Sequence, residues 1–289
     1  MLHRIRFGAG WLLGLSLLLA VSCSPTSPVH VPQTASPAPG WTATAVRTAA
    51  LPGPTPSPSP TATPSPQSRI CSPLEGYELT RLTEQISNPY KPPPPGSDDP
   101  HFGVDLADFS QPERIARSGM AVQAVLSGRV AGVIVNRFPY GNALIVETPL
   151  SDLDEQVLAR LNLPEAPEDV VQPLALTCPP YPLPEDWQSR PRSLYLLYAH
   201  LQDVPAVTPG GMVECGQVIG AVGDSGNALA PHLHLEARIG PADVNFPSMA
   251  HYDPSATNEE MAAYCLWRVS GLFQSMDAMC LLDKCSSAP

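Results

Sequence analysis

The chain has 289 residues, of which 37 are proline and only 15% are charged, and its formal net charge is −11. Four of its 16 Lys and Arg residues, but none of its 27 Asp and Glu residues, lie in residues 1–70, so residues 71–289 carry 12 basic residues and a net charge of −15. Nucleic-acid binding needs clustered Lys and Arg to neutralise phosphates, so this balance excludes a basic nucleic-acid-binding protein. The uneven composition excludes one uniform globular chain.

The first 23 residues have the pattern of an export signal. Arg4 and Arg6 precede an uncharged, leucine-rich run over residues 7–22, which is short for a membrane span but suits the apolar core of a secretory signal. Small residues then lead to Cys23, an arrangement that resembles a bacterial lipobox. We expect cleavage at Cys23 and lipidation there, which would anchor the protein to the outer face of the cytoplasmic membrane. An ordinary cleaved signal on a secreted protein is the alternative.

A proline-rich segment follows the signal. Residues 24–70 hold 12 prolines in 47 positions, mostly among Ser, Thr and Ala. A segment with almost no charge and little apolar content cannot bury a core, so we expect a disordered linker that favours the polyproline II conformation. Its composition suits a spacer from a membrane anchor into the cell wall, or a passive linker.

Short apolar runs separated by Gly and Pro begin at Cys71 and predict an all-β domain. Residues 130–135 and 142–147 read as strands, and residues 138–141 read as the turn between them. Many short strands with glycine turns are typical of this fold class. The other predicted strands are residues 194–200, 217–222 and 232–238.

Two segments depart from the strand pattern and predict helices. Ser151–Asp154 resembles a capping box, and it opens an apparent insertion of helix and proline-rich coil over residues 148–193. A second helix is expected near residues 258–276, with Asn258 as its cap. The first helix would bury Leu153, Val157, Leu158 and Leu161 on one face. The resulting division is a signal (1–23), a linker (24–70), a folded domain with its insertion (71–254), and a C-terminal helix with a cysteine-bearing tail (255–289).

Six cysteines remain once Cys23 is set aside. An even number in an exported chain predicts disulfides, and six cysteines allow 15 pairings among which the sequence does not choose. A cysteine zinc site is disfavoured because no C-x-x-C pair occurs. We expect the closely spaced Cys280 and Cys285 to tie the tail back to the core. The six are Cys71, Cys178, Cys215, Cys265, Cys280 and Cys285.

Histidines occur in three short motifs that together suit metal chemistry. Residues two apart on a strand face the same way, so His232, His234 and Glu236 share one face and the residues between them share the other. By the same rule Tyr198 and His200 share a face, which would bring His200 to the same groove. Two or three histidines with one carboxylate and an open position form the usual catalytic zinc site. His101-Phe-Gly-Val-Asp105 can supply the carboxylate and another imidazole.

In this order the motifs resemble the lysostaphin/LytM-type zinc metallopeptidases, which cut peptide cross-bridges of bacterial peptidoglycan. The resemblance covers about residues 97–245 and implies an antiparallel β-sheet, the duplicated hybrid motif, that forms a narrow groove with zinc at its floor. Besides the histidine motifs, it rests on residues 124–130, on Tyr140-Gly141-Asn142, on residues 216–220 and on Gly-x-Ser-Gly-Asn over residues 223–227.

Carried over residue by residue, the resemblance makes His101, Asp105 and His234 the zinc ligands, and His200 and His232 the catalytic histidines. It implies a zinc-dependent endopeptidase that hydrolyses cross-bridges or stem peptides of peptidoglycan in the cell envelope. Two alternatives stay open: a non-catalytic relative that activates a cell-wall amidase, and a metalloprotease that acts on an exported protein. Three other histidines match no motif of the family: His3, His30 and His251.

The sequence differs from the family pattern in four places. The insertion and the C-terminal helix are extra, and residues 106–120 form a longer stretch than usual. Some relatives have a groove tyrosine shortly before the first histidine, and the only candidate for it in this sequence is Tyr90. None of these differences touches the five site residues, so we expect them to bear on the range of substrates.

Overall fold

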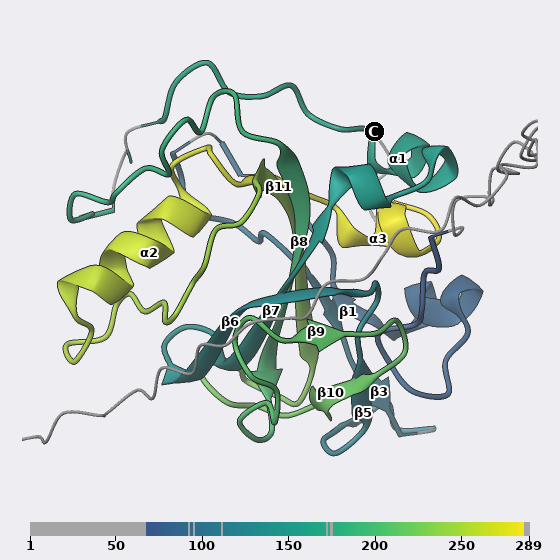
Figure 1. Ribbon diagram of the computed structural model, residues 1–289. Coiled ribbons are helices and arrows are strands. Elements are labelled where there is room, and N and C mark those ends of the chain that lie inside the picture. Colours follow the sequence, from purple (N-terminus) through teal and green to yellow (C-terminus); the bar gives the residue numbers. More distant parts are fainter. Residues whose placement is uncertain are drawn as a thin grey trace, which may run out of the picture. The chain divides into compact units, whose positions relative to one another are not determined.

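One antiparallel sheet organises the described residues of the computed structural model, 68–285 apart from 92, 95, 111, 172, 174 and 175 (Figure 1). The predicted export signal, the predicted lipid site at Cys23 and the linker up to residue 67 lie outside these residues. The strand order is β1-β2-β11-β8-β7-β6-β9, and β12 pairs beside them with β11. These strands are β1 (Ile86–Asn88), β2 (Val104–Leu106), β6 (Gly128–Arg137), β7 (Gly141–Pro149), β8 (Arg192–Leu201), β9 (Met212–Val213), β11 (Leu233–Pro241) and β12 (Gln274–Met276).

Smaller elements surround this sheet. Two short sheets pair β10 (Val218–Ala221) with β5 (Ala121–Gln123), and β3 (Asp108–Phe109) with β4 (Ala116–Arg117). In Figure 1, α2 lies to one side of the large sheet, and α1 and α3 lie near each other on the other side. The helices of the described residues are η1 (Leu79–Gln85), η2 (Leu150–Asp152), α1 (Glu155–Leu161), α2 (Asn258–Arg268) and α3 (Ala278–Leu282).

The central strands are covered on both faces. β8 is a nearly continuous apolar run, which is the pattern of a strand buried on both faces, and nine of its ten residues are buried. On one face Tyr198 and Leu235 pack with α1 and α3, and on the other Tyr195 packs with Trp267 of α2. The predicted all-β fold and all five predicted strands are confirmed, with strand ends that differ by one to three residues.

The two predicted helices are present, but their caps differ from the prediction. Ser151 lies in η2, and α1 starts after Asp154, whose carboxylate accepts a hydrogen bond from the Val157 amide. Likewise Thr257, not Asn258, caps α2 through a reciprocal capping box with Glu260. α2 also ends at Arg268, several residues before the predicted end. In both cases the cap is the residue that still has extended backbone angles, which the sequence does not show.

Three disulfides join all six cysteines of the described chain. Cys71 pairs with Cys215, Cys178 with Cys265, and Cys280 with Cys285. The second links the insertion to α2, and the third closes the C-terminal tail onto α3. Such a set is typical of proteins that fold in an oxidising compartment outside the cytoplasm.

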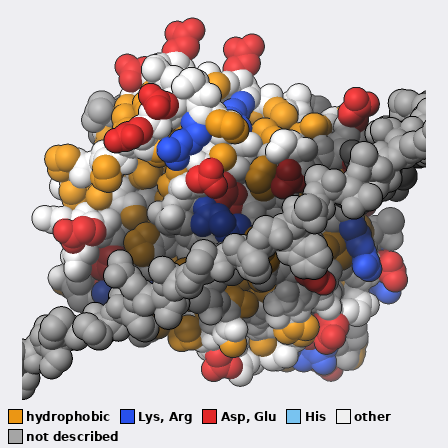
Figure 2. All heavy atoms as spheres, in the orientation of Figure 1, with side chains coloured by type: hydrophobic (Ala, Val, Ile, Leu, Met, Phe, Trp, Pro, Cys, Tyr) orange, Lys and Arg blue, Asp and Glu red, His pale blue; other side chains and the backbone are white. Residues whose placement is uncertain are grey.

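The surface of the described residues reflects their acidic composition. Figure 2 shows acidic side chains scattered over the face in view, with fewer basic ones among them. Within residues 68–285, no helix has the length and apolar content needed to cross a membrane.

Candidate metal centre

Strand pairing brings the two predicted metal motifs together. β2 lies antiparallel to β11 with Asp105 directly opposite His234. On its other side, β11 pairs with β8 so that His234 lies opposite Ala199, next to His200. His101 lies just before β2, where its carbonyl accepts a hydrogen bond from the Lys91 amide. Residues that are 133 positions apart in the sequence therefore meet at one point of the sheet.

Three metal-binding atoms converge at this point. His101 Nε2 lies 3.1 Å from Asp105 Oδ1 and 3.2 Å from His234 Nδ1, and His234 Nδ1 lies 2.8 Å from Asp105 Oδ1. Tetrahedral zinc with bonds of about 2.0 Å has ligand atoms about 3.3 Å apart. Both the kinds of atom and their spacing therefore fit a zinc ion that keeps an open position.

In each of the two histidines of the cluster, the ring nitrogen that points away from Asp105 is fixed by a hydrogen bond. His101 Nδ1 donates to the Pro89 carbonyl over 3.0 Å, and His234 Nε2 donates to Glu236 Oε1 over 3.1 Å. Such outer partners are what orients a metal-binding imidazole. They leave His101 Nε2 and His234 Nδ1 facing each other and Asp105, an arrangement that suits a cation between them.

The pKa values of Asp105 and His234 also favour a positive charge within the cluster. Burial by itself would raise the pKa of Asp105, but hydrogen bonds from His101 and His234 outweigh it and hold that pKa well below its usual value. Burial would likewise lower the pKa of His234, but its hydrogen bonds to Asp105 and Glu236 raise it to about 9. A proton on His234 therefore offsets the negative charge of the Asp105 and Glu236 carboxylates when no metal ion is bound. A metal ion that binds at Nδ1 would displace this proton.

The two predicted catalytic histidines lie beside the cluster in matching tautomers. His200 Nδ1 donates to the Ser225 carbonyl and His232 Nδ1 donates to the Ala230 carbonyl, each over 2.8 Å. In the neutral ring, Nε2 is then left as an unprotonated acceptor. The two ring centroids are 4.8 Å apart, and His232 Nε2 lies 3.5 Å from Asp105 Oδ1.

His200 reaches the groove by a route that the alternation rule missed. Tyr198 points into the core beside Leu235, so the prediction that it shares a face with His200 is wrong. His200 has φ of +60°, and the pairing of β7 with β8 shifts register beside it. A bulge with one left-handed residue turns that side chain to the other face of the strand, so His200 lies near His234, with ring centroids 5.7 Å apart.

The glycine of the first motif, Gly103, lies too close to its neighbours for a side chain to fit. A Cβ placed there would lie 2.8 Å from the His234 ring and 2.7 Å from the Leu235 carbonyl. Any side chain at this position would therefore force the His234 ring or the β11 backbone to move.

The cluster lies in a groove of about 1070 Å³ whose wall includes residues outside the predicted motifs. Leu176 comes from the insertion, Tyr252 comes from the end of the folded domain, and Tyr264 and Arg268 come from α2. Tyr90, the sequence candidate for a groove tyrosine, is buried against Ser275 and is not among the lining residues. Nothing in the local sequence around α2 marks it as part of a groove.

Glu236 is the centre of a buried network behind the cluster. Besides His234, its carboxylate accepts hydrogen bonds from the Tyr140 hydroxyl at 2.9 Å, Arg238 Nε at 2.8 Å and Trp267 Nε1 at 2.9 Å. Arg268 Nη1 adds a fifth donor at 2.8 Å. The alternation rule placed Glu236 on the correct face, but its donors from α2 could not be found from the sequence.

Comparisons with known proteins find similarity to peptidases over parts of the chain. Residues 189–246 match the model of Peptidase family M23. Over 68 residues the chain is 44% identical to the DD-carboxypeptidase/endopeptidase Mpg of Neisseria meningitidis serogroup B and of Neisseria gonorrhoeae. That match covers 24% of this chain and only 15% of the length of each relative.

Solved structures of similar fold include two bacterial peptidases. The catalytic domain of the prophage-encoded M23 protein EnpA from Enterococcus faecalis is 19% identical, with a TM-score of 0.32 over 55% of this chain and 84% of that one. The catalytic domain of the antimicrobial peptidase lysostaphin from Staphylococcus simulans is 21% identical, with a TM-score of 0.33 over 56% of this chain and 86% of that one.

Proposed function

We propose a function on the premise that this chain carries a domain of Peptidase family M23, the lysostaphin/LytM-type peptidases. On this premise the proposed activity is that of a zinc-dependent endopeptidase, which hydrolyses cross-bridges or stem peptides of peptidoglycan. The observation that carries the proposal is the convergence of His101 Nε2, Asp105 Oδ1 and His234 Nδ1 within 2.8–3.2 Å of one another. His200 and His232 lie beside them, each with Nδ1 hydrogen-bonded to a backbone carbonyl, which leaves Nε2 of the neutral ring unprotonated.

In this proposal His101, Asp105 and His234 hold the zinc ion. When bound, zinc would act as a Lewis acid and lower the pKa of a water molecule toward roughly 7. The three ligands contribute one negative charge, so the site would keep a net positive charge toward a peptide carbonyl. The groove around them has a volume of about 1070 Å³, which leaves room for a peptide segment beside the site.

In this proposal His200 and His232 carry out proton transfer. His232 Nε2, or His200 Nε2 with it, takes a proton from the attacking water, and the resulting imidazolium returns it to the leaving amine. The protonated ring can also donate a hydrogen bond to the developing oxyanion. The carbonyls of Ser225 and Ala230 hold both rings in the required tautomer throughout.

Peptidoglycan is favoured as substrate by the matched relatives and by the chain's own organisation. The curated relatives that part of the chain matches are named as a DD-carboxypeptidase/endopeptidase. The three disulfides suit a protein that works outside the cytoplasm.

Removal and return of the metal test this function. The full chain with its disulfides intact is expected to release shorter muropeptides from purified peptidoglycan, as measured by mass spectrometry. A chelator should abolish release, and stoichiometric zinc should restore it. A zinc-loaded protein that leaves peptidoglycan intact would contradict the proposal, and stimulation of an amidase by that protein would favour the regulatory alternative.

We also propose that the chain is anchored by a lipid on Cys23, with residues 1–23 as signal, 24–70 as spacer and 71–254 as the peptidase domain. The support is the lipobox-like end of the signal and the proline-rich composition that follows. Growth with a labelled fatty acid should label the wild-type chain and leave Cys23→Ala unlabelled. Unlabelled wild type, or a labelled Cys23→Ala, would contradict the anchor and favour secretion.

A further inference from the structure

Arg268, at the end of α2, contacts the carboxylate that supports His234 and the chain segment that leads to His101. Its Nε donates to Asp98 Oδ1 over 2.6 Å, and its Nη1 donates to Glu236 Oε1 over 2.8 Å. Asp98 lies three residues before His101, and Glu236 accepts the hydrogen bond from His234. One guanidinium therefore bridges the segment that carries His101 and the carboxylate that orients His234.

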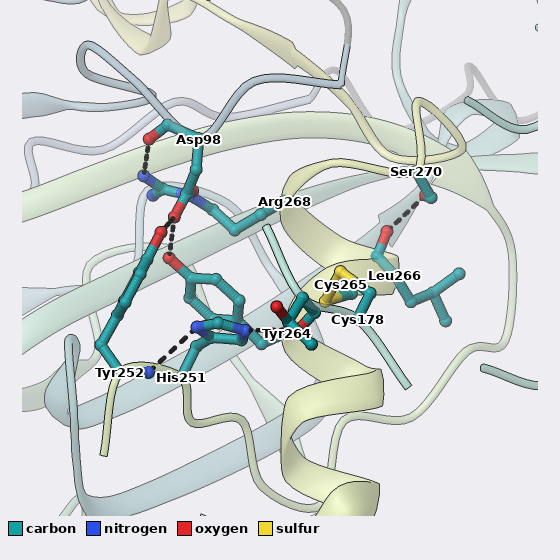
Figure 3. Close-up of a disulfide and its surroundings, with 10 residues drawn as sticks. Asp98, Cys178, His251, Tyr252, Tyr264, Cys265, Leu266, Arg268 and Ser270 are labelled. Carbon is teal, nitrogen blue, oxygen red and sulfur yellow. Dashed lines mark hydrogen bonds and ion pairs between the residues drawn. A yellow bond between two sulfur atoms is a disulfide. The ribbon is translucent and has the colours of Figure 1, made fainter. Parts of the chain in front are cut away.

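These contacts are shielded from water. The Arg268 side chain is 11% exposed, that of Asp98 is 13% exposed and that of Glu236 is fully buried. Figure 3 shows Arg268, Tyr252 and Tyr264 converging on Asp98, and both tyrosine hydroxyls donate to Asp98 Oδ2 over 2.8 Å. Hydrogen-bonded ions that are buried this well hold a defined geometry, and the loss of one partner leaves an uncompensated charge.

The helix that carries Arg268 is itself fixed at both ends. The Thr257 capping box sets its start. Near its end, Cys265 forms a disulfide with Cys178 of the insertion, three residues before Arg268 (Figure 3). α2 lies outside residues 189–246, the segment that the family model matches.

We infer that Arg268 is a positioning residue for the metal site, acting on His234 through Glu236 and on His101 through Asp98. The inference rests on the proposed function, in that it takes His101 and His234 to be zinc ligands. Arginine is required rather than a positive charge alone, because Nε donates to Asp98 while Nη1 donates to Glu236, and the compact ammonium of lysine lacks this rigid, spread set of donors. Trp267, whose Nε1 also donates to Glu236, supports the same carboxylate.

The test measures metal binding by the full chain rather than hydrolysis. Loss of an outer partner of a metal ligand typically lowers metal affinity about 10- to 100-fold. Arg268 contacts such a partner rather than a ligand, so Arg268→Lys should weaken zinc binding by about 10-fold, the lower end of this range, in a competition titration. It should also change the visible absorption of the cobalt-substituted protein, which reports ligand geometry. Trp267→Phe removes one donor to Glu236 and keeps an aromatic ring, so it should weaken zinc binding to a smaller extent.

Arg137→Lys is the matched control. Arg137 forms an ion pair of 2.7 Å with Glu260 of the same helix but contacts no part of the metal site, so zinc affinity should stay unchanged. Folding of every variant is checked by circular dichroism and thermal unfolding. If folded Arg268→Lys and Trp267→Phe bind zinc as wild type does, or if Arg137→Lys weakens binding equally, the positioning role is wrong.

Failure of the proposed function would look different. Wild type that binds zinc but cleaves no peptidoglycan would overturn the proposed activity, while the ratio of zinc affinities would still support or contradict the role of Arg268. Wild type that binds no zinc would overturn both.

Discussion

His234→Ala is expected to remove the metal and the hydrolytic activity together. The change deletes one of the three proposed ligand atoms and leaves His101 and Asp105, and two protein ligands are too few to hold zinc tightly. Metal ions contribute several kcal/mol to the transition state of such reactions, so kcat/KM should fall by at least roughly 10³-fold. Zinc content by elemental analysis and muropeptide release by mass spectrometry check the two losses in one preparation.

The fold should survive this change. Glu236 loses only one of its five donors and keeps Tyr140, Trp267 and both arginines. His251→Ala is the matched control, because His251 is an equally buried histidine that donates to the Thr177 carbonyl and stacks on Tyr264 without lining the groove. It should keep its zinc. A His234→Ala protein that still hydrolyses peptidoglycan would refute the assignment of His234.

Period-two alternation was enough to predict one side of the site. Along β11, Leu233 and Leu235 pack into the core, while His234 and Glu236 hydrogen-bond to each other on the opposite face. This part depends only on local geometry, so it could be derived from the sequence. The family resemblance then added which residue types belong together.

The remaining features depend on long-range pairing. Asp105 lies opposite His234 because β2 and β11 pair in one register, and a shift by one residue would turn one side chain away from the other. The left-handed backbone at His200 breaks the alternation that the sequence suggests. The contacts of Arg268 and the Cys178–Cys265 disulfide could not be predicted from the sequence either. They join α2 to distant parts of the chain, and such contacts leave no periodic pattern in the sequence.

His232→Ala is expected to keep the metal and lose turnover, in contrast to His234→Ala. The His232 side chain is 15% exposed, its Nδ1 contacts only the Ala230 carbonyl, and its Nε2 is 3.5 Å from Asp105. Its loss therefore leaves the three ligand atoms in place. A positioned proton carrier contributes about 10²- to 10⁴-fold, and kcat should fall by this factor while zinc content stays at one per chain.

The double variant His200→Ala/His232→Ala shows whether the two rings share this task. If both carry the same proton, the double variant should be little slower than the slower single variant, because residues that act as a unit are not additive. If one carries the proton and the other donates to the oxyanion, the losses should multiply. Loss of zinc from folded His232→Ala would contradict the separation of roles, since His232 would then belong to the metal site and not to proton transfer.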